Sequence, residues 1–153
     1  MPVKLNHTIV SSRDKQKSAL FLSRIMGLAA PTLLGPFALV EVGDQLTLDY
    51  VDTQKEIHPQ HYAFLVSEEE FDQIFGRVKQ DDLQYWADPM RQKAGELNHW
   101  DDGRGVYFND PDGHLLEILT RPYGSAGTVA EHPHPLVAET LTEGSNEADA
   151  APP

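Results

Sequence analysis

His7, His61 and Glu117 lie far apart in the chain, yet their residue types fit one shared chemical task. Each is the one strongly ionisable group within a short apolar run of β-type residues, and such runs are typical of strands covered on both faces. An unpaired charge in such a strand is costly, so we expect the three side chains to share a partner. A divalent metal fits, because two imidazoles and one carboxylate form the facial triad of non-haem iron sites, which leaves positions open for substrate and oxygen.

Each of the two histidines precedes a segment with helical periodicity. After His7, residues 14–26 place apolar side chains near one face, and Gly27 is a residue that ends helices. After His61, a capping box that begins at Ser67 predicts a second amphipathic helix. In both halves the histidine lies seven residues before the first acidic residue of the expected helix. The chain therefore contains a weak internal repeat.

Further strand candidates follow each expected helix. They lie near 31–34, at 37–42 and at 45–51 in the first half, and near 84–86, at 105–108 and at 115–120 in the second. Turn residues separate the last two strands of each half. The order βαβββ, repeated, predicts an α+β fold in which two modules form a curved mixed sheet around a metal-binding cavity, with the helices outside.

The composition limits the possible functions. The chain has 153 residues, a formal net charge of −12 and no cysteine, so any metal must be held by histidines and carboxylates, and a reducing cytoplasm is expected. The acidic balance, without a Lys/Arg cluster, argues against nucleic acid and anionic membrane surfaces as partners. No export signal and no run of about 20 apolar residues is visible, so we expect no membrane span.

The C-terminal part differs in composition from the rest. From about Pro122 the chain is rich in Ala, Pro, Gly, Glu and Thr, without a helical or strand period. We expect one domain at residues 1–123 and an acidic, disordered tail at 124–153. The histidines of the tail, His132 and His134, are interpreted as incidental rather than metal-binding.

Three segments carry a resemblance to a known family. Residues 5–10, 60–66 and 103–122, with the sequences LNHTIV, QHYAFLV and GRGVYFNDPDGHLLEILTRP, resemble the vicinal oxygen chelate superfamily, which includes glyoxalases, bleomycin resistance proteins and extradiol dioxygenases. The resemblance covers residues 4–121. It implies paired βαβββ modules, metal ligands at His7, His61 and Glu117, and a homodimer.

Within that superfamily, residues 99–117 are closest to the signature of extradiol ring-cleaving dioxygenases. The resemblance gives Tyr107 and His99 the role of hydrogen-bonding the bound diol and dioxygen. It implies Fe(II), dioxygen and a small aromatic, catechol-like substrate. Such enzymes carry an acid/base histidine in the strand before the second metal ligand, and this chain has no histidine there. Three residues are candidates to replace it as proton donor: Asp49, Tyr50 and His58.

Two alternatives remain open at this level. One is a glyoxalase-like isomerase or a thiol transferase of the fosfomycin-resistance type, using Mn, Ni or Zn. Against it, the family carboxylate of glyoxalases falls closest to Leu46, and the polar and basic residues of the phosphonate pocket are replaced by Ile9 and by small residues around Ala126. The other is a binding protein that sequesters an aromatic drug without turnover.

Overall fold

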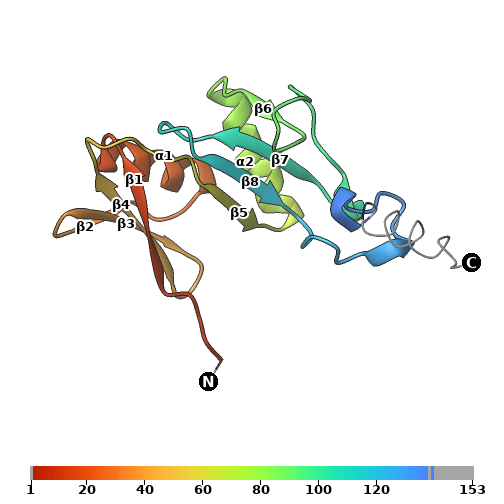
Figure 1. The fold of residues 1–153 in the computed structure, drawn as a ribbon, viewed down its shortest axis with the longest axis horizontal. Helices are drawn as coiled ribbons and strands as arrows, with labels where there is room; N and C mark the ends of the chain where they lie inside the picture. Colours follow the sequence, from red (N-terminus) through yellow and green to blue (C-terminus); the bar gives the residue numbers. More distant parts are fainter. Residues whose placement is uncertain (1, 138, 140–153) are drawn as a thin grey trace, which may run out of the picture.

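The computed structural model describes residues 2–137 and residue 139, which form two βαβββ modules side by side (Figure 1). The elements of the first module are β1 His7–Ser12, α1 Lys15–Met26, β2 Thr32–Leu34, β3 Phe37–Val42 and β4 Leu46–Asp52. Asp14 caps α1 by accepting the N–H of Lys17, and Gly27 ends the helix in the left-handed conformation (φ 71°). The predicted helix and strands of this half are confirmed.

The second module repeats the same order. Its elements are β5 His61–Leu65, α2 Glu68–Gln80, β6 Tyr85–Trp86, β7 Gly105–Asn109 and β8 Leu115–Leu119. Two short 3-10 turns, η1 Trp100–Asp102 and η2 Gly127–Val129, precede β7 and follow β8. The capping box at Ser67 and Glu70 is present with both of its hydrogen bonds. The predicted α+β fold of two βαβββ modules is therefore confirmed.

Each module forms its own four-stranded mixed sheet. The strand orders are β1-β4-β3-β2 and β5-β8-β7-β6, and the first strand of each module pairs in parallel with the last. Strands β1 and β5 therefore lie at open sheet edges, and within the described part of the chain the two sheets are not hydrogen-bonded to each other. One chain thus provides two separate four-stranded sheets rather than one continuous sheet.

The helices cover only one face of each sheet. Buried residues between the sheets and the helices form the core, among them the strand residues Val10, Tyr50, Phe108 and Ile118 and the helix residue Phe71. The opposite faces of β1 and β5 remain largely open, with burial that alternates along each strand. The expectation that these two strands are covered on both faces was wrong, because each is an edge strand with a helix on one side only.

The turn after β7 fastens the two modules together. Its His114 side chain is fully buried, with Nδ1 accepting the N–H of Gln60 and Nε2 2.8 Å from the carbonyl oxygen of Ser11 in β1. Asp112 of the same turn accepts hydrogen bonds from the hydroxyl of Ser18 and the N–H of Arg13. The contacts to Ser11, Arg13 and Ser18 join residues about 100 positions apart, so they determine how the two modules pack on one another.

The chain continues in contact with the second module after β8. Residues 122–137, which we call the C-terminal strap, lie beside the loop that contains η1, at the right of Figure 1. Packed structure therefore extends beyond residue 123, while residues 138 and 140–153 of the predicted tail lie outside the described residues. Across the described ranges, the structure contains no helix that is long and apolar enough to cross a membrane.

Candidate metal centre

His61 and Glu117 lie together at the open face of the second sheet. They come from the neighbouring parallel strands β5 and β8, where Ala63 pairs with Glu117. The Nε2 atom of His61 is 3.1 Å from Oε1 of Glu117. The His61 side chain is 43% exposed and that of Glu117 only 1%, so a partly exposed imidazole nitrogen faces a carboxylate held inside the protein.

The hydrogen bond on the other side of the His61 ring determines its tautomer. Nδ1 lies 3.0 Å from the carbonyl oxygen of Leu115, which can only accept, so Nδ1 carries a proton. Nε2 then faces a carboxylate oxygen of Glu117, and either a proton or a metal cation shared by the two groups satisfies both atoms. A backbone carbonyl that orients a histidine in this way is the usual support of a metal ligand. The two side chains therefore fit a divalent metal.

Two tyrosines hold the Glu117 carboxylate. The hydroxyl of Tyr123 donates to the carboxylate, at 2.5 Å from Oε1 and 2.7 Å from Oε2, and the hydroxyl of Tyr107 lies 2.7 Å from that of Tyr123. Burial raises the pKa of the Glu117 carboxyl, while the hydrogen bond from Tyr123 and then the neighbouring Tyr107 and His61 lower it in part. Burial likewise raises the pKa of both tyrosines, so both hydroxyls stay protonated and able to donate.

Tyr107 lies where its sequence position predicts, beside the proposed ligands. It is opposite Glu117 in the β7–β8 ladder, and its ring stacks on that of His61 at 5.8 Å between centroids. Its side chain is buried, with Trp100 packed against its edge. The structure thus brings together Tyr107, His61 and Glu117.

His7 does not join this group within one chain. Its side chain is exposed and its Nδ1 lies 2.7 Å from the side-chain oxygen of Asn6. Among residues 2–137 and 139, no three histidine, aspartate or glutamate side chains come together in a way that could hold a metal ion. A single chain therefore presents two of the three predicted ligands at one place and the third elsewhere.

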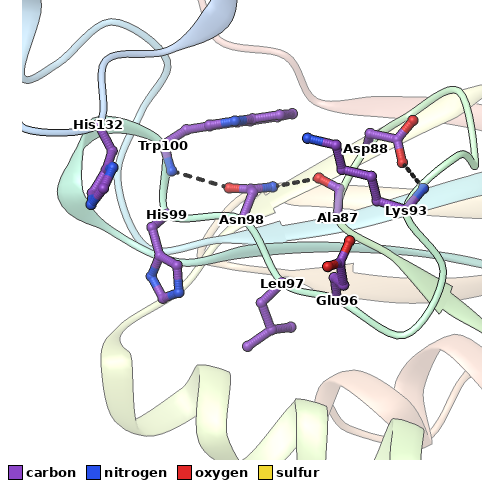
Figure 2. A pocket seen from close by; sticks show the side chains of 9 residues that line it. All are labelled: Ala87, Asp88, Lys93, Glu96, Leu97, Asn98, His99, Trp100 and His132. Atoms are coloured by element: carbon purple, nitrogen blue, oxygen red, sulfur yellow. Dashed lines mark hydrogen bonds between the residues drawn. The ribbon is translucent and has the colours of Figure 1, made fainter.

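His99 lies in a different pocket, shown in Figure 2. This cavity of about 300 Å³ is lined by polar and apolar side chains of the segment before β7, and His132 of the strap lies beside His99, with ring centroids 6.5 Å apart. Nδ1 of His99 is 3.2 Å from the carbonyl oxygen of Gly103. Within the described part of the chain, no hydrogen bond, ion pair or ring contact joins His99 to His61, Tyr107 or Glu117. The predicted role of His99 beside the metal has no geometric support within one chain.

The sequence interpretation missed Tyr123 and His134. His134 is 4% exposed and its ring packs on Tyr123 at 4.1 Å and on Trp100 at 4.8 Å, between centroids. The signal for Tyr123 was weak: an aromatic residue six positions after Glu117, just past the last predicted strand. The interpretation of His134 as not metal-binding stays a prediction, and the structure adds that its buried ring is part of the packing around Tyr123 and Trp100.

An apolar groove runs between β1 and β4 on one side and β5 on the other. It has a volume of about 590 Å³, and both His7 and His61 line it. Its other walls are mostly apolar, with Leu46 at the position where a glyoxalase carboxylate was expected. None of the described residues that line it is Lys, Arg, Asp or Glu.

The three candidates for the missing proton donor lie away from the Glu117 carboxylate. Tyr50 is buried in the core, where burial raises its pKa, and Asp49 accepts the hydroxyl of Thr47. His58 lines a small cavity with His114, outside the groove. None of the three contacts Glu117 within the described residues. Tyr123 and Tyr107 are the hydroxyl donors at the site.

This fold and this arrangement of ligands define a class of protein. The model of the Glyoxalase/Bleomycin resistance protein/Dioxygenase superfamily matches residues 4–118, and the chain belongs to that superfamily. Its members bind divalent metals and small-molecule substrates.

Two kinds of relative stand out within it. The glutathione transferase FosA of Serratia marcescens is 33% identical over 120 residues, which cover 74% of this chain and 78% of that protein. Among solved structures, the protein described as Oxidase ChaP-H2 is 58% identical with a TM-score of 0.81, covering 83% of this chain and all of that one. Oxidase ChaP-H1 is 55% identical with a TM-score of 0.79, over 81% of this chain and all of that one.

Proposed function

We propose that this protein is a metal-dependent oxidase or dioxygenase that acts on an aromatic, catechol-like substrate with two adjacent oxygens. The proposed metal ligands are His7, His61 and Glu117, with Fe(II) as the favoured ion. The observation that carries the proposal is the 3.1 Å distance between His61 Nε2 and Glu117 Oε1, with Nδ1 of the same ring bound to a backbone carbonyl. The identity of 58% and 55% to two proteins described as oxidases supports the reaction class.

When bound, a divalent metal would supply a Lewis acid that favours the deprotonated form of a diol and a place for a small co-substrate. The chain's own residues supply the rest. Tyr107 and Tyr123 remain protonated, and their hydroxyl hydrogens hold the Glu117 carboxylate, Tyr123 directly and Tyr107 through Tyr123. The ring of Tyr107, stacked on His61, limits how a planar substrate can approach the ligands.

We infer that the third ligand, His7, comes from a second copy of the chain. Exposed apolar side chains lie at the two open sheet edges: Ile9 in β1, Leu65 in β5 and Leu5 just before β1, each more than half exposed. Apolar surface of this kind favours association. In a two-fold dimer, the first sheet of one copy would cover the second sheet of the other, so two identical sites would form.

The charges around the site favour a neutral aromatic substrate. The groove between β1 and β5 is apolar and has no Lys or Arg among its described lining residues. Arg104 lies on the helix side of the second module, where it contacts Glu68 and Asp72 and lies over the ring of Phe71. An anionic phosphonate in the groove would therefore meet no Lys or Arg among its described lining residues.

A thiol transferase of the Fos type is the second candidate function. The 33% identity to the glutathione transferase FosA of Serratia marcescens favours it. It predicts thiol-dependent consumption of fosfomycin with a redox-inactive metal. We rank it second because the groove lacks the positive charge that such a substrate needs.

Metal analysis combined with two activity assays tests the proposal. The purified full-length protein would be reconstituted with Fe(II), Mn(II) or Zn(II), and oxygen uptake would be followed with a panel of catechols and other aromatic diols. Fosfomycin consumption would be measured in parallel with glutathione and with L-cysteine. Iron-dependent oxygen uptake supports the proposal, whereas thiol-dependent fosfomycin turnover without oxygen uptake would establish the second candidate.

A further inference from the structure

The C-terminal strap is fixed to the protein by two adjacent aspartates. The carboxylate of Asp101 accepts the N–H groups of Gly124 and Ala126, and that of Asp102 accepts those of Glu131 and His132. In return, the N–H of Asp101 donates to the carbonyl oxygen of His132 at 2.7 Å. These bonds join the strap, which lies outside the family-matched residues 4–118, to the η1 loop.

The backbone at these two aspartates adopts an uncommon conformation. Asp101 and Asp102 both have positive φ, 57° and 59°. A residue with a side chain in this region costs on the order of 1 kcal/mol, although Asp tolerates it better than most. The loop is therefore shaped so that two carboxylates in succession face the strap.

The strap places Tyr123 on the carboxylate of Glu117. The Tyr123 hydroxyl lies 2.5 Å from Oε1 of Glu117, the oxygen that also faces His61, and 2.7 Å from Oε2. Because a tyrosine hydroxyl has one hydrogen, Tyr107 must donate to Tyr123 when Tyr123 donates to Glu117. The three groups form a directed chain that ends at the proposed metal ligand.

The ring of Tyr123 is held in place by its neighbours. Trp100 meets it edge-on at 6.5 Å, and His134 packs on it at 4.1 Å. His134 is itself fixed, because its Nδ1 accepts the N–H of Leu136 and its ring is buried. Tyr123 cannot swing away from Glu117 without displacing the strap.

We propose that Tyr123 is a positioning residue that fixes the orientation of the Glu117 carboxylate beside His61 through hydroxyl contacts to both carboxylate oxygens, and that the strap is therefore a functional part of the site. This inference rests on the proposed role of Glu117 as a metal ligand. A donor that orients a coordinating carboxylate typically changes metal affinity by about 10–100-fold. We expect this loss of affinity in Tyr123→Phe, which keeps the ring and removes only the hydroxyl.

The test compares the metal dissociation constants of three tyrosine variants with that of the full-length protein. Tyr107→Phe leaves the bond from Tyr123 to Glu117 in place, so its loss should be smaller than that of Tyr123→Phe. Tyr85→Phe is the matched control: Tyr85 packs edge-on against Phe75, away from the site, and its variant should bind metal like the unchanged protein. The visible absorption of bound Co(II) reports ligand geometry, and it should change in Tyr123→Phe but not in Tyr85→Phe.

A substitution of Asp102 tests the contribution of the strap independently of the Tyr123 hydroxyl. Asp102→Gly keeps the left-handed backbone conformation, which glycine adopts readily, but removes the acceptor for Glu131 and His132. It should lower metal affinity without touching Tyr123 or Glu117. Equal affinity and equal Co(II) spectra in Tyr123→Phe and the unchanged protein would overturn this inference. If the unchanged protein itself binds no divalent metal, the proposed function fails first, and that result is distinguishable.

Discussion

If the site is shared between two chains, two inactive variants should restore each other. His7→Ala removes the ligand that one chain would lend to its partner, and His61→Ala removes the ligand that stays with Glu117. In a dimer that contains one copy of each, one site carries both substitutions and the other site carries neither. The mixed dimer therefore has one complete site out of two.

The expected recovery follows from counting. Random association of equal amounts yields about half mixed dimers, so the mixture should hold about a quarter of the metal sites of the unchanged protein. Each variant alone should hold almost none at a concentration that saturates the unchanged protein. If one chain assembled its own site, the mixture would stay at the level of its parents.

The assay uses two affinity tags and co-expression. Bound Co(II) per chain is measured by equilibrium dialysis in the unfractionated mixture, and again in mixed dimers isolated by sequential capture, which should hold about half of the metal sites of the unchanged protein. A mixture of His7→Ala with the double variant, His7→Ala plus His61→Ala, is the control because its mixed dimers contain no complete site. No recovery in the test mixture, or equal recovery in test and control, would refute the reasoning, as would a monomer in light scattering.

Three further results are expected. Because burial raises the pKa of Glu117, the folded state holds the carboxyl proton more tightly than the unfolded state, so this group stabilises the fold at low pH and loses that effect as pH rises through the folded pKa. The metal-free Glu117→Gln variant should therefore have a melting temperature a few degrees above that of the unchanged protein at pH 7, and the difference should disappear near pH 4. Equal melting temperatures of the two proteins at both pH values would contradict this prediction. His114→Ala should cost about 3–5 kcal/mol in urea unfolding, because it opens a buried cavity and leaves Gln60 and Ser11 unpaired; a cost under about 1 kcal/mol would show that the modules do not depend on it. His99→Ala should keep its metal affinity, and a tenfold loss of turnover on an active substrate would reinstate the role that its sequence position predicted.

Local signals in the sequence were sufficient for the elements and their order. The capping box at Ser67, the helix end at Gly27 and the two runs of helical periodicity all appear where expected. These signals depend only on residues close together in the sequence, so the helices and strands can be predicted without knowledge of the tertiary structure. The short strands β2 and β6 were only weakly marked, because two or three residues carry little periodicity.

The site was predictable only in part. Tyr107 and Glu117 occupy opposite positions of adjacent strands, so a correct strand register already brings them together. The positions of Tyr123 and His134 relative to Glu117 depend instead on how the strap packs against the η1 loop. That packing is held by the carboxylates of Asp101 and Asp102. No periodic pattern in the sequence predicts such contacts.

By itself, the sequence determined the repeated βαβββ order, the helix ends and the ionisable residues available to a metal, since these depend on neighbours along the chain. Only the tertiary structure decided that His61 and Glu117 meet while His7 stays apart, and that His99 lies in another pocket. The physical reason is that an edge strand is open on one side, and which partner covers it is a matter of packing between distant surfaces.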